Sequence, residues 1–288
     1  MSDPIRADQL DPTPADLSGV ANRYGIGSLT KLGGFENLLY RSEDGRILRL
    51  THTSRRSVAD VEAEVAFMQH LATHDVPVVV PIPSAAGRLA EQFTLEDGNE
   101  VVAYCMTEAP GEIFNPKDWT DEWLVALGDL LGRAHVAAES YDGPRRPSWT
   151  DDFFDPGTAQ CPDAEIVEAW RIARDHAADH PAGGDHLLIH QDAHFWNQHV
   201  DEGRLTLFDF DDCGYGTPEH DLAIVLFYWA FDFDATDAGV RRLIDNLFEG
   251  YRRHRELMHD WREGFDRIMK VREADLLLIM VNEQNDWG

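Results

Sequence analysis

Three features are scarce in this 288-residue chain, and each scarcity excludes a class of protein. Cys105, Cys161 and Cys213 are widely separated and form no C-x-x-C pair, which argues against a disulfide framework and against a cysteine-rich zinc site. Lysine and arginine number 25 against 53 acidic residues, so we do not expect a partner with a phosphate backbone or an anionic membrane. No apolar run approaches the roughly 20 residues that a membrane-spanning helix needs.

The amino terminus, MSDPIRADQLDPTPADLSG, has neither the basic start nor the apolar segment of a secretory signal, so we expect a soluble, cytoplasmic protein. The net charge of −28 has two interpretations. One is a solvated acidic surface, and the other is an acidic cleft for a cationic substrate. Net charge alone does not choose between them.

The pattern of the chain changes near residue 110. Before it, LLYR and RILRL flank an Asp44-Gly45 turn, and LAEQFTL and VVAYCM flank an Asp97-Gly98 turn, which predicts two β-hairpins. Between the hairpins, residues 57–77 carry apolar side chains at helical spacing and end at a proline. We therefore predict a small β-rich N-terminal lobe over residues 1–108.

Helical patterns dominate the remainder, which predicts a larger, mainly helical lobe over residues 109–288 and an α+β fold. The expected helices cover residues 121–139, 163–179, 218–232, 237–258 and 260–281. Two short apolar strands interrupt them, HLLIH and RLTLFDF, and the polar segment HQDAHFWNQHV lies between these strands. Such an arrangement suggests an enzyme with a cleft between its lobes.

The polar segment permits three interpretations. His190, Asp192 and His194 alternate as in some zinc or iron sites, which would make the protein a metal-dependent hydrolase, although no second compact ligand group accompanies them apart from one acidic cluster. A polar loop whose histidines are capped by backbone groups is the second. The third is the kinase spacing H-x-D-x-x-x-x-N, in which Asp192 and Asn197 face one reaction centre.

The kinase spacing predicts a further carboxylate nearby. An aspartate would meet the acceptor hydroxyl while the asparagine oxygen reaches a magnesium ion, and magnesium prefers several hard oxygen ligands. Asp209 follows an apolar strand twelve residues after Asn197, where the D-F-G aspartate of kinases would fall, although Asp211 replaces the glycine. Burying a carboxylate without a partner costs several kcal/mol of free energy, and a bound divalent cation would offset that cost.

HQDAHFWNQHV, LFDFDDCGYG and EHDLA together resemble the aminoglycoside phosphotransferase and choline kinase family. The resemblance implies a two-lobed protein-kinase-like fold and an ATP- and Mg²⁺-dependent transfer of phosphate to a small-molecule hydroxyl. It also implies that Asp192 is the catalytic base, that Asn197 and Asp209 bind magnesium, and that Asp221 braces the catalytic loop. His135, in LGRAH, is interpreted as structural. The resemblance leaves the acceptor open, cationic molecules included.

The N-terminal half can be compared with the same family. Gly33 and Gly34 would form the turn of a nucleotide-covering hairpin, and Arg49 stands where kinases carry a phosphate-binding lysine on the third strand. Helical periodicity places Glu64 near the apolar face of the following helix and Glu62 outside it. Glu64 is therefore the expected partner of Arg49, unless its side chain extends outward to solvent.

The segment VVAYCMTEAPGE would connect the two lobes, with backbone groups from Met106 to Glu108 meeting the adenine edge of the nucleotide. Two rival functions remain open at this point. One is a binding or regulatory protein that keeps the kinase fold without turnover. The other is the metal-dependent hydrolase that uses His190 and His194 directly.

Overall fold

The chain divides into two compact units in the computed structural model. The first comprises residues 1–110 and 141–145, and the second comprises residues 111–140 and 146–288. The structure describes residues 5, 7–34, 36–113, 119–179, 186–232, 236–257 and 259–286.

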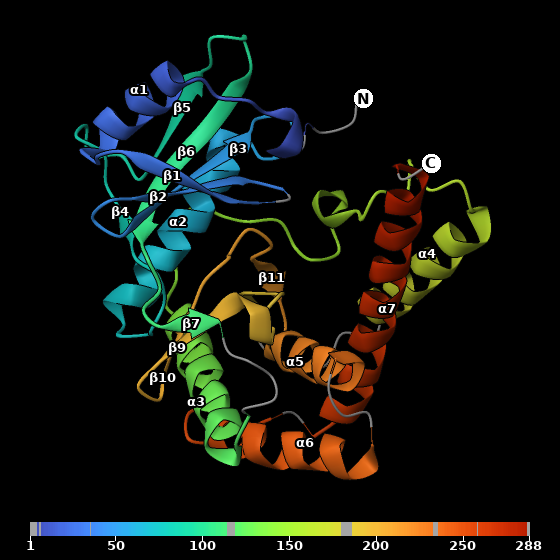
Figure 1. Cartoon of the computed structure of the whole chain (residues 1–288). Helices are drawn as coiled ribbons and strands as arrows, with labels where there is room; N and C mark the ends of the chain where they lie inside the picture. The colour runs from blue at the N-terminus through green and yellow to red at the C-terminus, as the bar shows by residue number, and fades with distance from the viewer. Residues whose placement is uncertain are drawn as a thin grey trace. The chain divides into compact units, whose positions relative to one another are not determined.

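An antiparallel sheet forms the centre of the first unit, with the strand order β1-β2-β3-β6-β4 and with β5 also paired to β6 (Figure 1). Two helices and one short 3-10 helix accompany it. The elements are η1 (Ala7–Gln9), α1 (Pro14–Tyr24), β1 (Leu29–Gly33), β2 (Leu38–Ser42), β3 (Arg46–His52), α2 (Val58–Thr73), β4 (Pro81–Ile82), β5 (Ala90–Thr94) and β6 (Glu100–Thr107). Both predicted hairpins and the predicted helix are present.

Side-chain alternation along β3 separates the two faces of this sheet. Leu48 and Leu50 belong to a buried apolar cluster that also contains Tyr24 of α1. Arg49, between them, points to the other face, where it contacts Glu64 of α2. The two-residue period of a strand thus places one arginine among the leucines of a central strand and directs it toward a helix carboxylate.

Five α-helices are described in the second unit, together with two small antiparallel sheets, β10-β9-β7 and β11-β8. The helices are α3 (Asp121–Ala138), α4 (Ala164–Asp179), α5 (Pro218–Asp232), α6 (Asp237–Tyr251) and α7 (Trp261–Asp286). The strands and 3-10 helices are β7 (Glu112–Ile113), η3 (Asp152–Phe154), β8 (Leu187–Ile189), η4 (Phe195–Asn197), β9 (Gln198–Asp201), β10 (Arg204–Leu207) and β11 (Gly214–Gly216).

The α+β composition predicted from the sequence is confirmed, with two local differences. The segment between the predicted strands contains a strand of its own, β9, which pairs with β10, while β8 pairs with β11. The helix expected over residues 237–258 ends at Tyr251. Residues 252–256 are RRHRE, so they offer no apolar face that would stabilise a longer helix by packing.

Close helix contacts build the second unit. The backbones of α3 and α6 approach so closely that a Cβ on Gly128 would overlap Leu247 O, and a Cβ on Gly250 would overlap Val125 O. Elsewhere α4 and α7 run along each other, with Trp170 and Leu278 in a shared apolar cluster (Figure 1). None of the helices in the described ranges combines the length and apolar composition that crossing a bilayer requires.

Candidate active site

The loop that carries Asp192 is held by a buried carboxylate from α5. Asp221 lies in the first turn of that helix, and its Oδ2 and Oδ1 accept from the backbone N–H groups of His190 (3.1 Å) and Gln191 (2.6 Å). Gln191 adopts φ 65°, a left-handed conformation that is uncommon outside glycine. The two hydrogen bonds to one carboxylate offset the cost of that conformation and fix the turn that leads into Asp192.

Asp221 is itself held from the opposite side. His135 of α3 places Nε2 3.0 Å from Asp221 Oδ2, and its Nδ1 lies 2.9 Å from the Tyr251 hydroxyl of α6. Burial disfavours the Asp221 carboxylate, but His135 and His190 outweigh it and lower its pKa. An ionised carboxylate can therefore stay buried beneath the loop and orient it.

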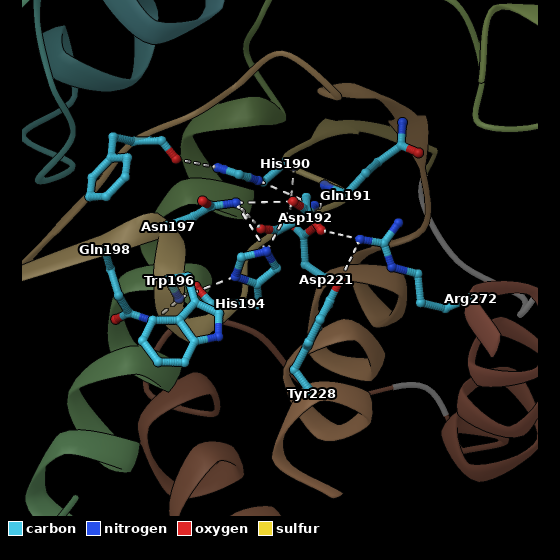
Figure 2. Close-up of polar contacts among 11 residues, drawn as sticks. His190, Gln191, Asp192, His194, Trp196, Asn197, Gln198, Asp221, Tyr228 and Arg272 are labelled. Atoms are coloured by element: carbon cyan, nitrogen blue, oxygen red, sulfur yellow. Dashed lines mark hydrogen bonds and ion pairs between the residues drawn. The ribbon is translucent and has the colours of Figure 1, made fainter. Parts of the chain in front are cut away.

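Asp192 is surrounded by donors from its own loop (Figure 2). Asn197 Nδ2 donates to Asp192 Oδ2 at 3.0 Å and to the Asp192 carbonyl oxygen at 2.9 Å. His194 Nδ1 accepts from the Trp196 backbone N–H, so Nε2 carries the proton, and Nε2 lies 3.1 Å from Asp192 Oδ2. These contacts fix one oxygen of the carboxylate within the loop.

The other oxygen of Asp192 meets an arginine from far along the chain. Arg272 of α7 donates from Nη2 to Asp192 Oδ1 at 2.6 Å and to the Tyr228 hydroxyl at 2.6 Å. Burial opposes the ionisation of Asp192, but Arg272 and His194 outweigh it and hold the pKa of the carboxyl well below its usual range. The side chains of Arg272 and Asp192 remain 18% and 17% exposed, so the pair is partly open.

Asn197 and Asp209 are brought near each other by Phe208. The Phe208 N–H donates to the Asn197 carbonyl oxygen at 3.0 Å, and its own carbonyl oxygen lies 3.0 Å from His190 Nε2. Asp209 follows directly, exposed and at φ 63°. In Figure 2 the Asn197 amide nitrogen points to Asp192 and its oxygen points away. An amide oxygen and an exposed carboxylate are hard oxygen donors of the kind that Mg²⁺ takes.

The histidine-based hydrolase finds no support in this geometry. His190 Nδ1 accepts from the Asp192 N–H at 3.2 Å, and Nε2 faces the Phe208 carbonyl oxygen. His194 uses both ring nitrogens as described above. Within the described ranges, no three or more His, Cys, Asp or Glu side chains are grouped as a metal site. The imidazoles shape the loop.

The first unit contains the residues predicted for nucleotide binding. Arg49 Nη1 lies 2.9 Å from Glu64 Oε1, and both atoms also lie within 3.0 Å of the Tyr104 hydroxyl. The Asn37 carboxamide, with its oxygen toward the arginine, accepts from Arg49 Nη2 at 2.8 Å. The Arg49 and Glu64 side chains are 3% and 0% exposed, so this ion pair is enclosed.

The other predicted residues of this unit lie on strand ends and turns. Gly33 and Gly34 have φ 119° and 124°, and a Cβ on Gly34 would overlap the Asn37 carbonyl oxygen, so this turn requires glycine. Met106 lies near the end of β6, and Glu108 follows that strand and pairs with Arg41. The structure thus groups the predicted residues in two sets, one in each unit.

Two contributors to the site were not identified from the sequence as site residues. Arg272 lies 80 residues after Asp192 in a helix rich in charge, and no local spacing distinguishes it from its neighbours. His135 had a signal, the L-G-x-x-H pattern, but a single histidine on a helix is more often structural than catalytic. In the structure it supports Asp221, which is a structural role within the site.

Known proteins share the sequence pattern and the fold of this chain. Residues 29–257 match the phosphotransferase enzyme family (APH). Amicoumacin kinase of Bacillus subtilis (strain 168) is 28% identical over 261 residues, which cover 85% of this chain and 78% of that protein. A homoserine kinase of Bartonella tribocorum is 24% identical over 302 residues, which cover 96% of this chain and 88% of that protein.

Solved structures share the fold. The amicoumacin kinase hAmiN, in complex with AMP-PNP, Ca²⁺ and Ami, superimposes with a TM-score of 0.83 at 24% identity, over 93% of this chain and 85% of that chain. A microcompartment-associated aminopropanol kinase gives 0.69 at 22% identity, over 93% and 94%. The predicted resemblance and the kinase-like fold are confirmed. Because the family match spans most of its length, this chain belongs to the phosphotransferase enzyme family.

Proposed function

We propose that this protein transfers the γ-phosphoryl group of ATP to a hydroxyl group of a small molecule, with Mg²⁺ as the metal. The family match supports a phosphotransferase. The observation that carries the proposal is the hydrogen bond from Asn197 to Asp192, on a loop that Asp221 holds from below. Phosphoryl transfer depends on positioning and charge stabilisation, which this loop is built to provide.

Asp192 is the group that meets the acceptor hydroxyl. As the oxygen of that hydroxyl bonds to the γ-phosphorus and the bond to the ADP oxygen breaks, the hydroxyl proton passes to the carboxylate. The lowered pKa of Asp192 makes it a weak base, so its main contribution is to orient the hydroxyl and accept the proton late. His194, Asn197 and Arg272 hold the carboxylate in one orientation for that purpose.

Asn197 and Asp209 are the residues that would hold the metal, through the amide oxygen and the carboxylate. When bound there, Mg²⁺ supplies positive charge to the phosphate oxygens. The structure of a relative with AMP-PNP and Ca²⁺ supports a nucleotide and a divalent cation as ligands of this fold. The spacing of Asn197 and Phe208 keeps the two ligand residues at the ends of one short hairpin.

The first unit would supply the residues that bind the nucleotide. Gly33 and Gly34 form a turn in which backbone N–H groups can approach phosphate without side-chain interference. Arg49 would contribute positive charge to the phosphates, with Glu64 fixing its position. The backbone from Met106 to Glu108 would meet the adenine edge.

A nucleotide-consumption assay tests the proposal. Purified protein with ATP and Mg²⁺ is offered amino alcohols, aminoglycosides, homoserine and sugars, and ADP release is measured. We expect acceptor-dependent ADP release with at least one of these classes. Asp192→Ala should reduce the rate by at least about a thousandfold, since it removes the group that orients the acceptor.

Asp237→Asn provides the control, because that aspartate lies at the start of α6 with its side chain 95% exposed. Its turnover should equal that of the unmodified protein. If Asp192→Ala kept its rate within about tenfold, the role given to Asp192 would be wrong. Absence of ATP turnover with every acceptor, alongside normal nucleotide binding, would favour a non-catalytic protein of the same fold.

A further inference from the structure

Arg272 has one hydrogen-bond donor that the described part of the chain does not use. Its hydrogen bonds to Asp192 and to Tyr228 both come from Nη2. Its Nε is buried and has no hydrogen-bond partner among the described residues. A guanidinium has five N–H donors arranged in a plane, so one edge can hold Asp192 while the other binds a second group.

A second buried hydrogen-bond donor lies beside Asp192 in the sequence. Gln191 Nε2 is buried and without a hydrogen-bond partner in the described part of the chain. This carboxamide lies against β11, where a Cβ on Gly214 would overlap Nε2, so a side chain at that position would displace the amide. Buried donors without partners are costly, and a ligand that only accepts hydrogen bonds would relieve that cost.

We infer that Arg272 selects the phosphoryl acceptor, and that it favours hydroxy compounds carrying a carboxylate a few bonds from the reacting hydroxyl. The inference rests on the proposed function and specifies its substrate class. A carboxylate is acceptor-only, it matches the planar fork of a guanidinium, and its charge is opposite to that of Arg272. An ammonium at the same place would meet a like charge and could not accept from either donor.

The position of Arg272 explains why it would discriminate. Its Nη2 lies 2.6 Å from Asp192 Oδ1, so any acceptor whose hydroxyl reaches Asp192 has its neighbouring atoms close to the guanidinium. The side chain is 18% exposed, so part of the guanidinium is accessible from solvent although Nε is buried. Tyr228 limits its movement through the hydrogen bond to Nη2 and through the ring, whose centroid lies 5.4 Å from the guanidinium carbon.

Asp275 carries a charge opposite to that of Arg272 and is a second residue whose substitution tests the inference. It lies three residues further along α7, and electrostatic attraction links it to Arg272. Its Oδ1 accepts from Trp170 Nε1 at 2.6 Å. Its negative charge should weaken the binding of an anionic acceptor. Asp275→Asn removes that charge and keeps an oxygen for Trp170.

The test uses three acceptors that differ in one group: γ-hydroxybutyrate, its amide, and the amino alcohol of the same length. kcat/KM is measured by ADP release. We expect a preference of roughly 10- to 100-fold for the carboxylate over the amide, the size of one charge-assisted pair. In Arg272→Met the ratio should fall to about one, whereas in Asp275→Asn it should rise. Arg272→Lys, which keeps the charge and loses the fork, should be intermediate.

Lys270→Met is the matched control, because it removes a positive charge from the same helix at a side chain that is 62% exposed. Its ratio should equal that of the unmodified protein. Calorimetric binding of the three compounds in the presence of ADP and Mg²⁺ makes the test independent of turnover. Binding of γ-hydroxybutyrate that Arg272→Met abolishes would support the role of Arg272 even if no phosphate were transferred.

Other outcomes would overturn the inference. Turnover of the amide or the amino alcohol at least as fast as of the carboxylate contradicts it while the proposed function stands. An unchanged ratio in Arg272→Met contradicts it equally, and so does failure of γ-hydroxybutyrate to bind the unmodified protein. Loss of ATP turnover with all acceptors, with carboxylate binding retained, contradicts the proposed function alone.

Discussion

The two units of the molecule each contain one arginine–carboxylate pair of functional interest, and the pairs differ in enclosure. Arg49 and Glu64 are 2.9 Å apart and at most 3% exposed, whereas Arg272 and Asp192 are 2.6 Å apart and nearly a fifth exposed. The enclosed pair is shielded from solvent, and Glu64 holds Arg49 in a fixed position from which its charge would act on the phosphates. The open pair can exchange part of its hydrogen bonding with a substrate.

Enclosure also changes what each pair contributes to folding. An enclosed pair is costly to bury, and removing one partner leaves an uncompensated charge in the interior. A partly open pair can be replaced in part by water, so its loss affects the positioning of the acceptor more than stability. The comparison therefore predicts that equivalent substitutions in the two pairs separate activity from stability.

The largest effect is expected at the open pair. Asp192→Asn, with the best acceptor found, should lower kcat by about a thousandfold or more, since it removes the charge that we propose orients the acceptor and takes up the proton. The melting temperature should change by only a few degrees. A loss of stability comparable with that of a Glu64 variant would show that the open pair is structural as well.

The next largest effect is expected at the enclosed pair. Glu64→Gln should lower the free energy of unfolding by about 3–5 kcal/mol, because it neutralises the carboxylate that faces the enclosed charge of Arg49. Urea titration followed by circular dichroism measures this change. A destabilisation below about 1 kcal/mol would mean that water reaches Arg49.

Asp275 gives a smaller, pH-dependent effect near the open pair. Burial raises the pKa of its carboxyl to about 6, opposed by Arg272. The folded state therefore binds the proton more tightly than the unfolded state, so this group stabilises the fold at low pH, and that contribution is lost as pH rises through about 6. Asp275→Asn should stabilise the protein by about 1–3 kcal/mol at pH 7.5 and by roughly half as much at pH 5. Melting curves at both values of pH, compared with the unmodified protein, test this; an equal gain at both would contradict it.

The smallest effect serves as the reference for Glu64. Glu62 lies on the exposed side of the same helix and pairs with Arg88 at 3.3 Å, with side chains 45% and 54% exposed. Glu62→Gln should change the free energy of unfolding by less than about 1 kcal/mol, as is usual for surface pairs. A larger loss in the same urea titration would mean that Glu62 and Glu64 differ less in their contribution to stability than their exposed fractions indicate.

The parts of the site that the sequence could predict are those set by local spacing. Asp192 and Asn197 are five residues apart in one loop, and that spacing alone brings the amide to the carboxylate. Helical periodicity similarly chose Glu64 over Glu62 as the partner of Arg49, which the structure shows as an ion pair. The loop spacing is local, and helical periodicity selects which face of α2 carries Glu64; the contact itself then needs only that α2 packs on the Arg49 face of the sheet.

Contacts between elements far apart in the sequence could not be predicted from local spacing. Arg272 reaches Asp192 only because α7 packs beside α4 and α5, and side-chain patterns do not specify which helices meet. The same holds for His135, whose place under Asp221 depends on the crossing of α3 and α6. The pairing of β8 with β11 depends on a turn around Asp211 and Asp212 that carries no clear spacing signal.

The close crossing of α3 and α6 has a consequence for the accuracy of the site. At Gly128 and Gly250 backbone meets backbone, with no side chain between the helices to adopt alternative rotamers. His135 and Tyr251 leave these same two helices and meet at Asp221, which fixes the backbone before Asp192. The side chains that position the proposed base therefore start from two helices whose main chains are in direct contact, so a rigid crossing elsewhere in the fold limits the positional error at Asp192.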